Sequence, residues 1–415
     1  MLTIEPYTFG VGDRFGHQGR AQLQAIVQAR ELGIPVYPVW NKSYREHSLI
    51  RTKPDDVRAE ADAAVNALGW TGAYYVDADH INRKNVSAFI QGSNFFTIDV
   101  ADFTGRKADP ADEERVVKAM RGPTKGLQIP GISRPLHISE TTMRAAVGKF
   151  LAAVREAGNT YREIVALRGA DTFVTEVSMD ETESAQTPIE LLLILAMIRL
   201  EEIPVQTIAP KFTGRFNKGV DYAGDLSQFE REFDEDLSVV TFAIQEFNLP
   251  KGLKLSVHSG SDKFSLYPSI NRLIKKRGAG LHVKTAGTTW LEEIIGLAEV
   301  GGDGLEIAKE VYSQAFARID ELQGAYLPVI DIRPEKLPKP VKVDSWNSSM
   351  YVNALRHDDS NPDYNPDFRQ LLHIAFRIAA EMGERFLSAL KTYEPSIAPN
   401  VTENILARHI QPIFG

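Results

Sequence analysis

Short hydrophobic runs alternate with longer segments of helical periodicity over most of the chain. Helical patterns follow most of these runs, for example at residues 21–32 and 225–247. A strand followed by a helix, repeated eight times, predicts an α/β protein built as a (β/α)8 TIM-type barrel. The runs that we assign to strands are residues 7–12, 35–40, 73–79, 95–100, 172–179, 205–212, 253–258 and 280–285.

One helix start has a distinctive sequence. Thr187 precedes Pro188, and Glu190 follows three residues after the threonine. This is the pattern of a capping box with proline at the first helical position, which satisfies N–H groups of the first turn. The body of this helix, residues 191–198, is apolar throughout. We therefore expect it to lie buried against the sheet.

Two stretches depart from the strand–helix repeat. Residues from about 102 to 139 are polar and rich in proline and glycine, which predicts an insertion after the fourth strand. From residue 331 onward, the proline-rich segment 333–340 breaks the pattern, and the remainder has helical periodicity. We predict a barrel catalytic domain over residues 1–330 and a helical C-terminal extension, residues 331–415, packed on the barrel.

The composition excludes several classes of protein. The 415 residues are 43% hydrophobic and 25% charged, and the formal net charge of −8 argues against a concentrated basic face for nucleic acid. The longest apolar run, residues 189–198 with Glu190 interrupting it, is much shorter than the roughly 20 residues of a membrane span. The N-terminal residues lack the basic and apolar regions of a signal peptide. We expect a cytoplasmic protein that binds neither nucleic acid nor membrane.

Polar residues collect where the predicted strands end. In a (β/α)8 barrel, the functional groups lie at the C-terminal ends of the strands. The residues found there are Asp13 and Arg14, Asp77, Asp79 and His80, Asp99, Glu176 with 180–183, Lys211 and Arg215, 258–263, and His282 with Lys284. The sequence therefore predicts an active site at this end of the barrel.

Three of the nine histidines, His80, His258 and His282, lie in or at the ends of predicted strands. Any one of them alone is more often structural or exposed. Together at one barrel mouth, three imidazoles with open positions for water or substrate are typical of a catalytic metal site. Because the chain has no cysteine, the ligands must be His, Asp and Glu, which accept zinc, manganese, nickel or cobalt.

Other catalytic signatures are missing from the sequence. The stretch Gly10-Val-Gly-Asp-Arg-Phe-Gly16 differs by one position from a dinucleotide fingerprint and has no acidic ribose-binding partner. The sequence has neither a P-loop motif nor a nucleophile elbow of the G-x-S-x-G type. Nicotinamide, nucleoside triphosphate and acyl-transfer chemistry therefore have no support, and a turn that brings Asp13 and Arg14 to the barrel mouth is the better interpretation.

The motifs resemble those of the tagaturonate epimerase family. The likeness runs from about residue 7 to 300, and includes Asp77-Ala-Asp-His80 and the long segment 219–232. Members of this family interconvert D-tagaturonate and D-fructuronate with a divalent metal, so the resemblance implies a sugar-acid substrate. The other matching segments are residues 9–16, 96–99, 177–183, 256–264 and 282–287.

A second, local likeness is to class II aldolases, which carry an Asp-His pair at a strand end and a His-x-Gly-Ser turn. Mapped onto this chain, it makes Asp79 an acid/base and His80 and His258 metal ligands. The reaction that the family implies inverts a carbon β to a ketone, where simple proton abstraction gives no stabilised carbanion. Retro-aldol cleavage, rotation of the aldehyde and re-addition is therefore our hypothesis, with the metal as Lewis acid.

Inversion of a hydroxyl-bearing carbon by this route requires proton transfer at both epimeric positions. We assign Asp79 and Glu176 to these transfers, although Glu176 is equally suited to be a fourth metal ligand. We expect Asp77, Asp180 and Glu183 to cap helices or to orient the imidazoles. The candidates for substrate binding are Asp13, Arg14, Lys211, Arg215, Ser259, Lys263 and Lys284.

Three other functions remain open at this point. A metal-dependent aldolase that releases its fragments needs the same metal and base. An aldose–ketose isomerase acting on sugar acids moves a hydrogen between C1 and C2 instead. A non-catalytic sugar-acid binding protein gives no reason for acids and histidines to coincide at strand ends. The sequence does not decide which metal is used, or whether the protein forms a homo-oligomer.

Overall fold

A closed barrel of eight parallel strands forms the centre of the computed structural model, which describes residues 2–120, 126–285 and 287–415. Each strand pairs with its neighbours in sequence, and β1 closes the barrel against β8. All eight overlap the predicted runs, so the (β/α)8 prediction is confirmed. The strands are β1 (Tyr7–Val11), β2 (Val36–Ser43), β3 (Tyr75–Ile81), β4 (Phe95–Asp99), β5 (Val174–Ser178), β6 (Thr207–Ala209), β7 (Lys254–Val257) and β8 (Leu281–Val283).

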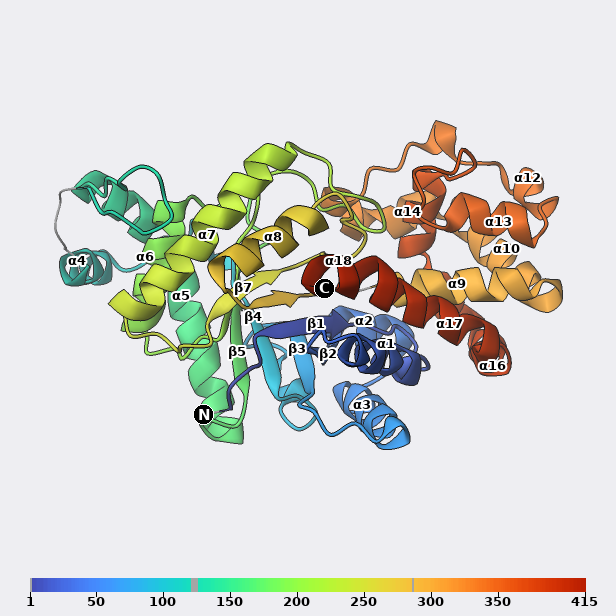
Figure 1. Cartoon of the computed structure of the whole chain (residues 1–415), viewed down its shortest axis with the longest axis horizontal. Coiled ribbons are helices and arrows are strands. Elements are labelled where there is room, and N and C mark those ends of the chain that lie inside the picture. Colours follow the sequence, from blue (N-terminus) through green and yellow to red (C-terminus); the bar gives the residue numbers. More distant parts are fainter. Residues whose placement is uncertain (1, 121–125, 286) are drawn as a thin grey trace.

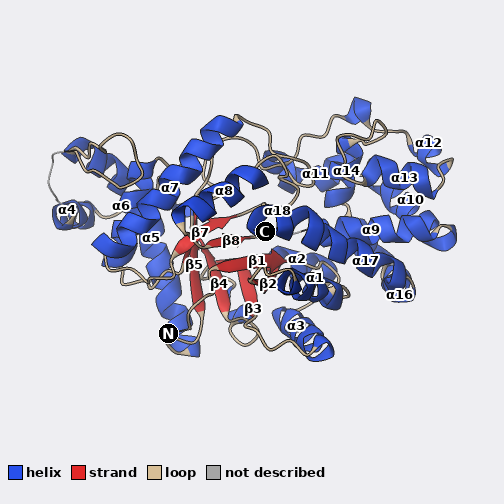
Figure 2. Ribbon diagram, in the orientation of Figure 1, coloured by secondary structure: helices blue, strands red, loops and turns tan. Residues whose placement is uncertain are grey.

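Helices surround this barrel (Figures 1 and 2). The helix predicted from the capping box begins as expected: Thr187 accepts a hydrogen bond from the Glu190 N–H, and the Glu190 carboxylate accepts from the Thr187 N–H. Its apolar body is buried. The helices up to the last strand are α1 (Gly19–Glu31), α2 (Tyr44–Ile50), α3 (Pro54–Leu68), α4 (Pro110–Ala119), α5 (Glu140–Arg168), α6 (Pro188–Leu200), α7 (Leu226–Glu246) and α8 (Tyr267–Arg277).

The segment predicted as an insertion, residues 102–139, lies between β4 and α5 and contains α4 and an antiparallel bridge between Leu127 and Leu136. Residues 121–125 within it lie outside the described part. Figure 1 shows α4 beyond α5 and α6, far from the C-terminal helices. The division of the chain into a barrel domain and an extension stays a prediction.

The described chain after β8 consists of helices joined by loops, and one of the longer loops is residues 356–365. Several of these helices gather beside the barrel, whereas α17 and α18 return to it, and Phe414 packs 5.2 Å from the Tyr7 ring on β1. These helices are α9 (Thr288–Val300), α10 (Gly302–Ala317), α11 (Ile319–Gln323), α12 (Pro340–Asp344), α13 (Ser348–Leu355), α14 (Pro366–Ile374), α15 (Phe376–Met382), α16 (Glu384–Thr392), α17 (Glu394–Ile405) and α18 (Gln411–Phe414), with the 3-10 turn η3 (Gly324–Val329) among them.

The interior of the barrel changes character along the strands. At the N-terminal end, Val39, Tyr75, Phe95 and Val174 pack into one apolar cluster. Two residues further along the same strands, where the side chains face the same way, stand Asn41, Asp77, Thr97 and Glu176, all buried. The apolar layer closes the bottom of the barrel, and a layer of buried polar groups lies between it and the barrel mouth.

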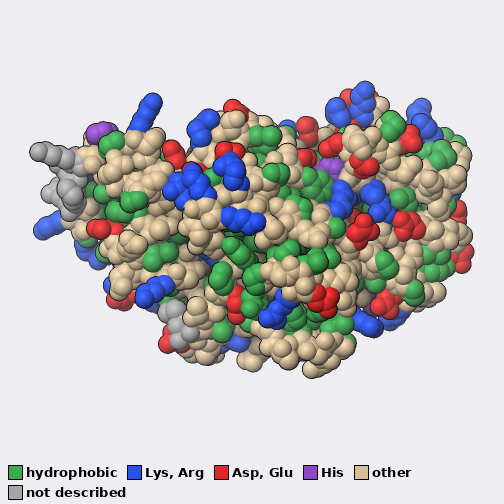
Figure 3. Space-filling view, viewed as in Figure 1, with side chains coloured by type: hydrophobic (Ala, Val, Ile, Leu, Met, Phe, Trp, Pro, Cys, Tyr) green, Lys and Arg blue, Asp and Glu red, His purple; other side chains and the backbone are tan. Residues whose placement is uncertain are grey.

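The surface carries charges of both signs. On the face shown in Figure 3, basic and acidic side chains are interspersed over the barrel helices and the C-terminal helices alike. Within the described residues, every helix is too short or too polar to cross a lipid bilayer.

Candidate metal centre and active site

The end of β3 carries an irregularity that directs His80. The register between β3 and β4 shifts between Ala78 and Ile81, and His80 has a left-handed backbone with φ of 52°. A bulge of this kind redirects a side chain at a strand end. The His80 Nδ1 lies 2.7 Å from Asp79 Oδ1, so the carboxylate that precedes the histidine orients its ring.

The ends of β5 and β7 supply the second imidazole and a facing carboxylate. His258 follows β7, and its Nε2 lies 2.8 Å from Oε1 of Glu176 on β5. Asp180, two residues after β5, faces both histidines: its Oδ1 lies 3.6 Å from His80 Nε2, and its Oδ2 lies 3.1 Å from His258 Nδ1. One ligand atom from each of these three residues lies within 4.8 Å of the others.

These three residues fit a metal ion. Each imidazole uses one ring nitrogen on a buried carboxylate, which leaves the other nitrogen facing Asp180. Neither His80 Nε2 nor His258 Nδ1 has a hydrogen-bond partner among the described residues. When the imidazoles are neutral, these two nitrogens and the Asp180 carboxylate present lone pairs to one another that a cation can share, and histidines held from behind by carboxylates are the usual arrangement around bound metals. The His80–Asp180–His258 group can therefore hold a divalent cation.

Lys284, at the end of β8, lies among the carboxylates beneath this group. Its Nζ is 2.7 Å from Asp77 Oδ2, 2.9 Å from Asp79 Oδ1 and 3.3 Å from Glu176 Oε1. Burial lowers the pKa of this ammonium, but the three carboxylates outweigh burial and raise the pKa well above its ordinary value. A lysine surrounded in this way neutralises the residues that hold the imidazoles, and because it also borders the narrower cavity, its contact with substrate stays a prediction.

The same contacts set the protonation of the buried acids. Burial raises the pKa of Asp79 and of Glu176, but Lys284 together with the adjacent histidine, His80 or His258, outweighs burial and holds both pKa values well below their ordinary range. At Asp77 burial wins, and its pKa rises to about 6. For His80 and His258 burial lowers the pKa, yet the facing carboxylates raise it above 6.5.

His282 lies apart from the candidate metal group. Its side chain is fully buried, with Nδ1 2.9 Å from the Thr8 hydroxyl and the ring 5.3 Å from the Phe95 ring, close to the apolar layer. Burial lowers its pKa to about 3. The structure brings His80 and His258 together as predicted, but Asp180 takes the place expected for His282.

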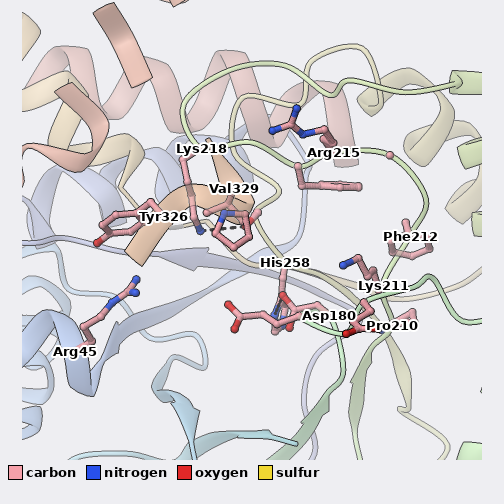
Figure 4. Close-up of a pocket in the computed structure, with 16 residues that line it drawn as sticks. Arg45, Asp180, Pro210, Lys211, Phe212, Arg215, Lys218, His258, Tyr326 and Val329 are labelled. Carbon is pink, nitrogen blue, oxygen red and sulfur yellow. Dashed lines mark hydrogen bonds and ion pairs between the residues drawn. The ribbon is translucent and has the colours of Figure 1, made fainter. Parts of the chain in front are cut away.

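Two neighbouring cavities, which share lining residues such as Asp180 and His258, lie at the group. The wider, of about 470 Å³, is lined by Asp180, Lys211, Arg215, Lys218 and Ser259 among others. The narrower, of about 60 Å³, reaches down to Asp79, His80 and Lys284. In Figure 4, Arg45, Lys211 and Lys218 point from different sides toward the space above His258 and Asp180. Three of the predicted substrate-binding residues, Lys211, Arg215 and Ser259, therefore line the wider cavity.

The remaining predicted substrate-binding residues form internal contacts. The Asp13 carboxylate accepts hydrogen bonds from the N–H groups of Phe15, Gly16 and Gln18, and so shapes the turn after β1. Arg14 pairs with Glu46, and burial lowers its pKa to about 10. Among the described residues, neither Asp13 nor Arg14 lines the two cavities.

Lys263 borders the narrower cavity but is also committed to internal contacts. Its Nζ donates to the carbonyls of Asn217, Val220 and Ser261, at 2.9, 2.7 and 2.9 Å. The neighbouring Asp262 pairs with Arg369 of α14, at 3.0 Å, rather than with Lys263. These two residues thus fix the loop after β7.

Sequence reasoning missed several residues of the site. Lys218, Arg45 and Tyr326 line the wider cavity, yet they come from a loop, a short helix and η3. Asp180 was placed only in a supporting role. Its position just past a strand in an acidic run, Asp180–Glu183, was the one signal that could have made it a ligand candidate.

Function in a parallel barrel of this kind lies at the C-terminal ends of the strands, and here those ends carry imidazoles, carboxylates and a lysine beneath a cavity. The molecule is therefore a TIM-barrel enzyme. The chain belongs to the tagaturonate epimerase family, because the UxaE family model, described as tagaturonate epimerase, matches residues 2–411. It is an isomerase of the epimerase class that acts on carbohydrates.

Individual relatives agree with this membership. A tagaturonate/fructuronate epimerase from Thermotoga maritima is 28% identical over 424 residues, which cover 98% of this chain and 81% of that protein. The native crystal structure of the fructuronate-tagaturonate epimerase UxaE from Cohnella laeviribosi superposes with a TM-score of 0.80 at 24% identity, covering 100% of this chain and 82% of that chain. A one-glycerol complex of the Cohnella enzyme gives 0.77 at 24% identity, covering 98% and 82%. At this identity, the two structures establish the shared fold.

Proposed function

We propose that this enzyme interconverts D-tagaturonate and D-fructuronate with a divalent metal held by His80, Asp180 and His258. The observation that carries the proposal is the convergence of one atom from each of these residues within 4.8 Å at the barrel mouth. Membership of the tagaturonate epimerase family supplies the substrates. Imidazole and carboxylate ligands suit zinc, manganese, nickel or cobalt.

A divalent cation in this position supplies Lewis-acid chemistry at a ketone oxygen. The protein holds the ligands in place: Asp79 accepts from the His80 ring, and Glu176 accepts from the His258 ring. Glu176 is fully buried below His258, so its part is to orient that imidazole rather than to touch substrate. Lys284 balances the charge of both carboxylates.

Asp79 is the proton acceptor in this proposal. Its Oδ1 takes the contacts from both His80 and Lys284, and the residue borders the narrower cavity. Its Oδ2 then accepts the proton of the substrate hydroxyl on the carbon to be inverted. Cleavage of the adjacent C–C bond leaves a three-carbon aldehyde that rotates and is attacked again, after which Asp79 returns the proton to the new hydroxyl.

Metal removal and replacement test the proposed activity. Protein stripped with a chelator and shown to be metal-free by elemental analysis is incubated with D-tagaturonate, alone and with zinc, manganese, nickel or cobalt. We expect D-fructuronate to form only with added metal. Full conversion by the metal-free protein would rule out the metal, and absence of the epimer with every ion would rule out the substrates.

The fate of the carbon skeleton tests the cleavage route. Retro-aldol chemistry predicts that a carbonyl-trapping reagent captures tartronate semialdehyde during turnover, with no solvent deuterium at the inverted carbon. Deuterium incorporation there would indicate proton abstraction instead. Net loss of the six-carbon chain without an epimer would identify an aldolase.

A further inference from the structure

The cations at the barrel mouth differ in how completely they are used. Lys284 is held by three carboxylates and Lys263 by three carbonyls. Lys211 donates to the Thr182 carbonyl, and Arg215 pairs with Asp331 at 3.3 Å. Each of these groups already has an electron-rich partner within the protein, so binding a substrate anion would require it to exchange that partner.

Lys218 is different. Its Nζ makes one hydrogen bond, to the Ser259 hydroxyl at 3.2 Å, and no described carboxylate forms an ion pair with it. Burial and the nearby Arg14 charge both lower its pKa, and the acids Glu181 and Asp180 offset this only in part. A partly buried ammonium without a counter-ion is costly, and an anionic ligand at this position would compensate that cost.

The position of Lys218 is fixed by its backbone. Its N–H donates to the Val329 carbonyl of η3 at 2.8 Å, which ties the loop between β6 and α7 to the C-terminal helices. Its side chain borders both cavities. Figure 4 shows it descending between Tyr326 and Val329 toward His258, with its hydrogen bond drawn as a dashed line. The ammonium thus faces the space in which a ligand of the metal group would lie.

We propose that Lys218, assisted by the Ser259 hydroxyl, binds the carboxylate of the sugar-acid substrate and so selects hexuronates over neutral ketohexoses. This rests on the proposed function for the identity of the substrate. A six-carbon ketouronate carries its ketone near one end and its carboxylate at the other. The metal group would bind the ketone end, and the Lys218 ammonium beside it would bind the carboxylate end. Arg45, at the exposed rim of the wider cavity, adds positive potential from the other side.

The test replaces the charge and compares charged with neutral ligands. In metal-loaded Lys218→Met, we expect KM for D-tagaturonate to rise about tenfold to a hundredfold, as for a lost hydrogen bond to a charged group, with kcat less affected. Binding of D-galactonate, a six-carbon sugar acid, should weaken similarly in calorimetry, whereas binding of galactitol, its neutral counterpart, should be unchanged. Lys218→Arg should recover part of the affinity for both sugar acids.

Two controls make the result decisive. Lys276→Met removes a lysine from the far end of α8, which pairs with Asp234 at 3.0 Å, and should leave every constant unchanged. Lys218→Gln, which keeps a donor for Ser259, replaces the methionine variant if that protein does not fold. If the wild type does not epimerise D-tagaturonate, the proposed function fails. Galactonate binding is measured without turnover, so it tests the role of Lys218 separately.

Three outcomes would overturn the assignment. The first is a Lys218→Met protein that binds D-galactonate as tightly as the wild type. The second is equal weakening for galactonate and galactitol, or loss of bound metal, which would give Lys218 a structural role. The third is a rise in KM for D-tagaturonate in Arg45→Met but not in Lys218→Met, which would move the carboxylate site to the rim.

Discussion

Two groups of buried charges lie only four residues apart on the loop after β7, and they are built in opposite ways. His258 begins the loop and belongs to the candidate metal group with His80 and Asp180. Asp262 belongs to what we call the Asp262 anchor, formed with Arg369, His357 and His409. In the anchor, Asp262 Oδ2 lies 3.0 Å from Arg369 Nη2, and the Asp262 N–H donates to His409 Nε2 at 3.0 Å.

The difference lies in whether the protein supplies a permanently charged partner: Asp262 has Arg369, whereas Asp180 faces only two imidazoles. Arg369 donates to the Gly219 and Leu355 carbonyls as well as to Asp262 Oδ2, so the buried carboxylate has a cation of its own. Its Oδ1 lies 3.8 Å from His357 Nδ1 and has no hydrogen-bond partner among the described residues. Burial raises the pKa of Asp262, yet Arg369 and the histidines hold it well below its ordinary value. At the metal group, by contrast, the ring nitrogens of His80 and His258 that face Asp180 have no hydrogen-bond partner among the described residues. The buried carboxylate that has a cation of its own, Arg369, holds the loop, whereas the ring nitrogens that face Asp180 are placed to bind a ligand.

The largest effect is expected from His258→Ala. The variant removes one of the three converging atoms, and should lose bound metal and all measurable epimerisation. The loss should exceed the tenfold to hundredfold typical of residues behind a ligand. Because the anchor is untouched, the thermal unfolding midpoint of the metal-free variant should match that of metal-free wild type. Full metal content in this variant would remove His258 from the ligand set.

The anchor should respond in stability instead. Arg369→Met leaves the Asp262 carboxylate buried without its cation, which costs about 3–5 kcal/mol of unfolding free energy. Chemical denaturation measures this loss. The control is Arg385→Met, which breaks an exposed pair with Glu310 and should cost only about 0–1 kcal/mol. Equal stability losses in the two variants would mean that the Asp262 anchor does not hold the loop.

A smaller effect, on metal affinity, is expected from changing Glu176, which contacts His258 on the side away from Asp180. Glu176→Gln keeps the shape of the side chain that orients His258 but removes its charge. Metal affinity should fall about tenfold to a hundredfold, measured by competition with a chelating dye. Asp77→Asn is the matched control, because Asp77 contacts Lys284 and Thr97 but no imidazole. If Asp77→Asn weakened metal binding as much as Glu176→Gln, the cause would be the loss of negative charge inside the barrel, and not the loss of the contact that orients His258.

The same contrast explains what the sequence could predict. All eight strands were located, because parallel barrel strands are buried on both faces and appear as compact apolar runs. His80 and His258 were recognised because they stand at strand ends. Their roles, like those of Asp79 and Glu176, stay predictions. Asp180 and Lys218 lie in loops, whose paths depend on distant contacts such as the hydrogen bond from Lys218 to Val329, and periodicity does not report these.

The hydrophobic periodicity of the sequence could not predict the irregular backbone at the site either. The register shift between Ala78 and Ile81 turns His80 toward Asp180, and a strict alternation of inward and outward residues gives no sign of it. For Lys263 and Lys284 the sequence predicted the position at the barrel mouth but not the contacts. Their charge and strand-end position suggested substrate contacts, but only the three-dimensional structure shows that their N–H groups are already used.

The smallest effect is expected at the N-terminal cap of α6, which contributes to the stability of the barrel but contacts neither the metal group nor the Asp262 anchor. Thr187→Ala removes the side-chain acceptor for the Glu190 N–H at the start of α6, and loss of such a cap costs about 0.5–2 kcal/mol. Unfolding should become easier by this amount, while metal affinity and KM stay unchanged. Thr172→Ala, which removes an exposed hydroxyl bonded to the Gly169 carbonyl, should shift stability by less than about 0.5 kcal/mol. A change in metal affinity with Thr187→Ala would show that the site is coupled to the whole barrel, and that the metal group and the Asp262 anchor are not independent.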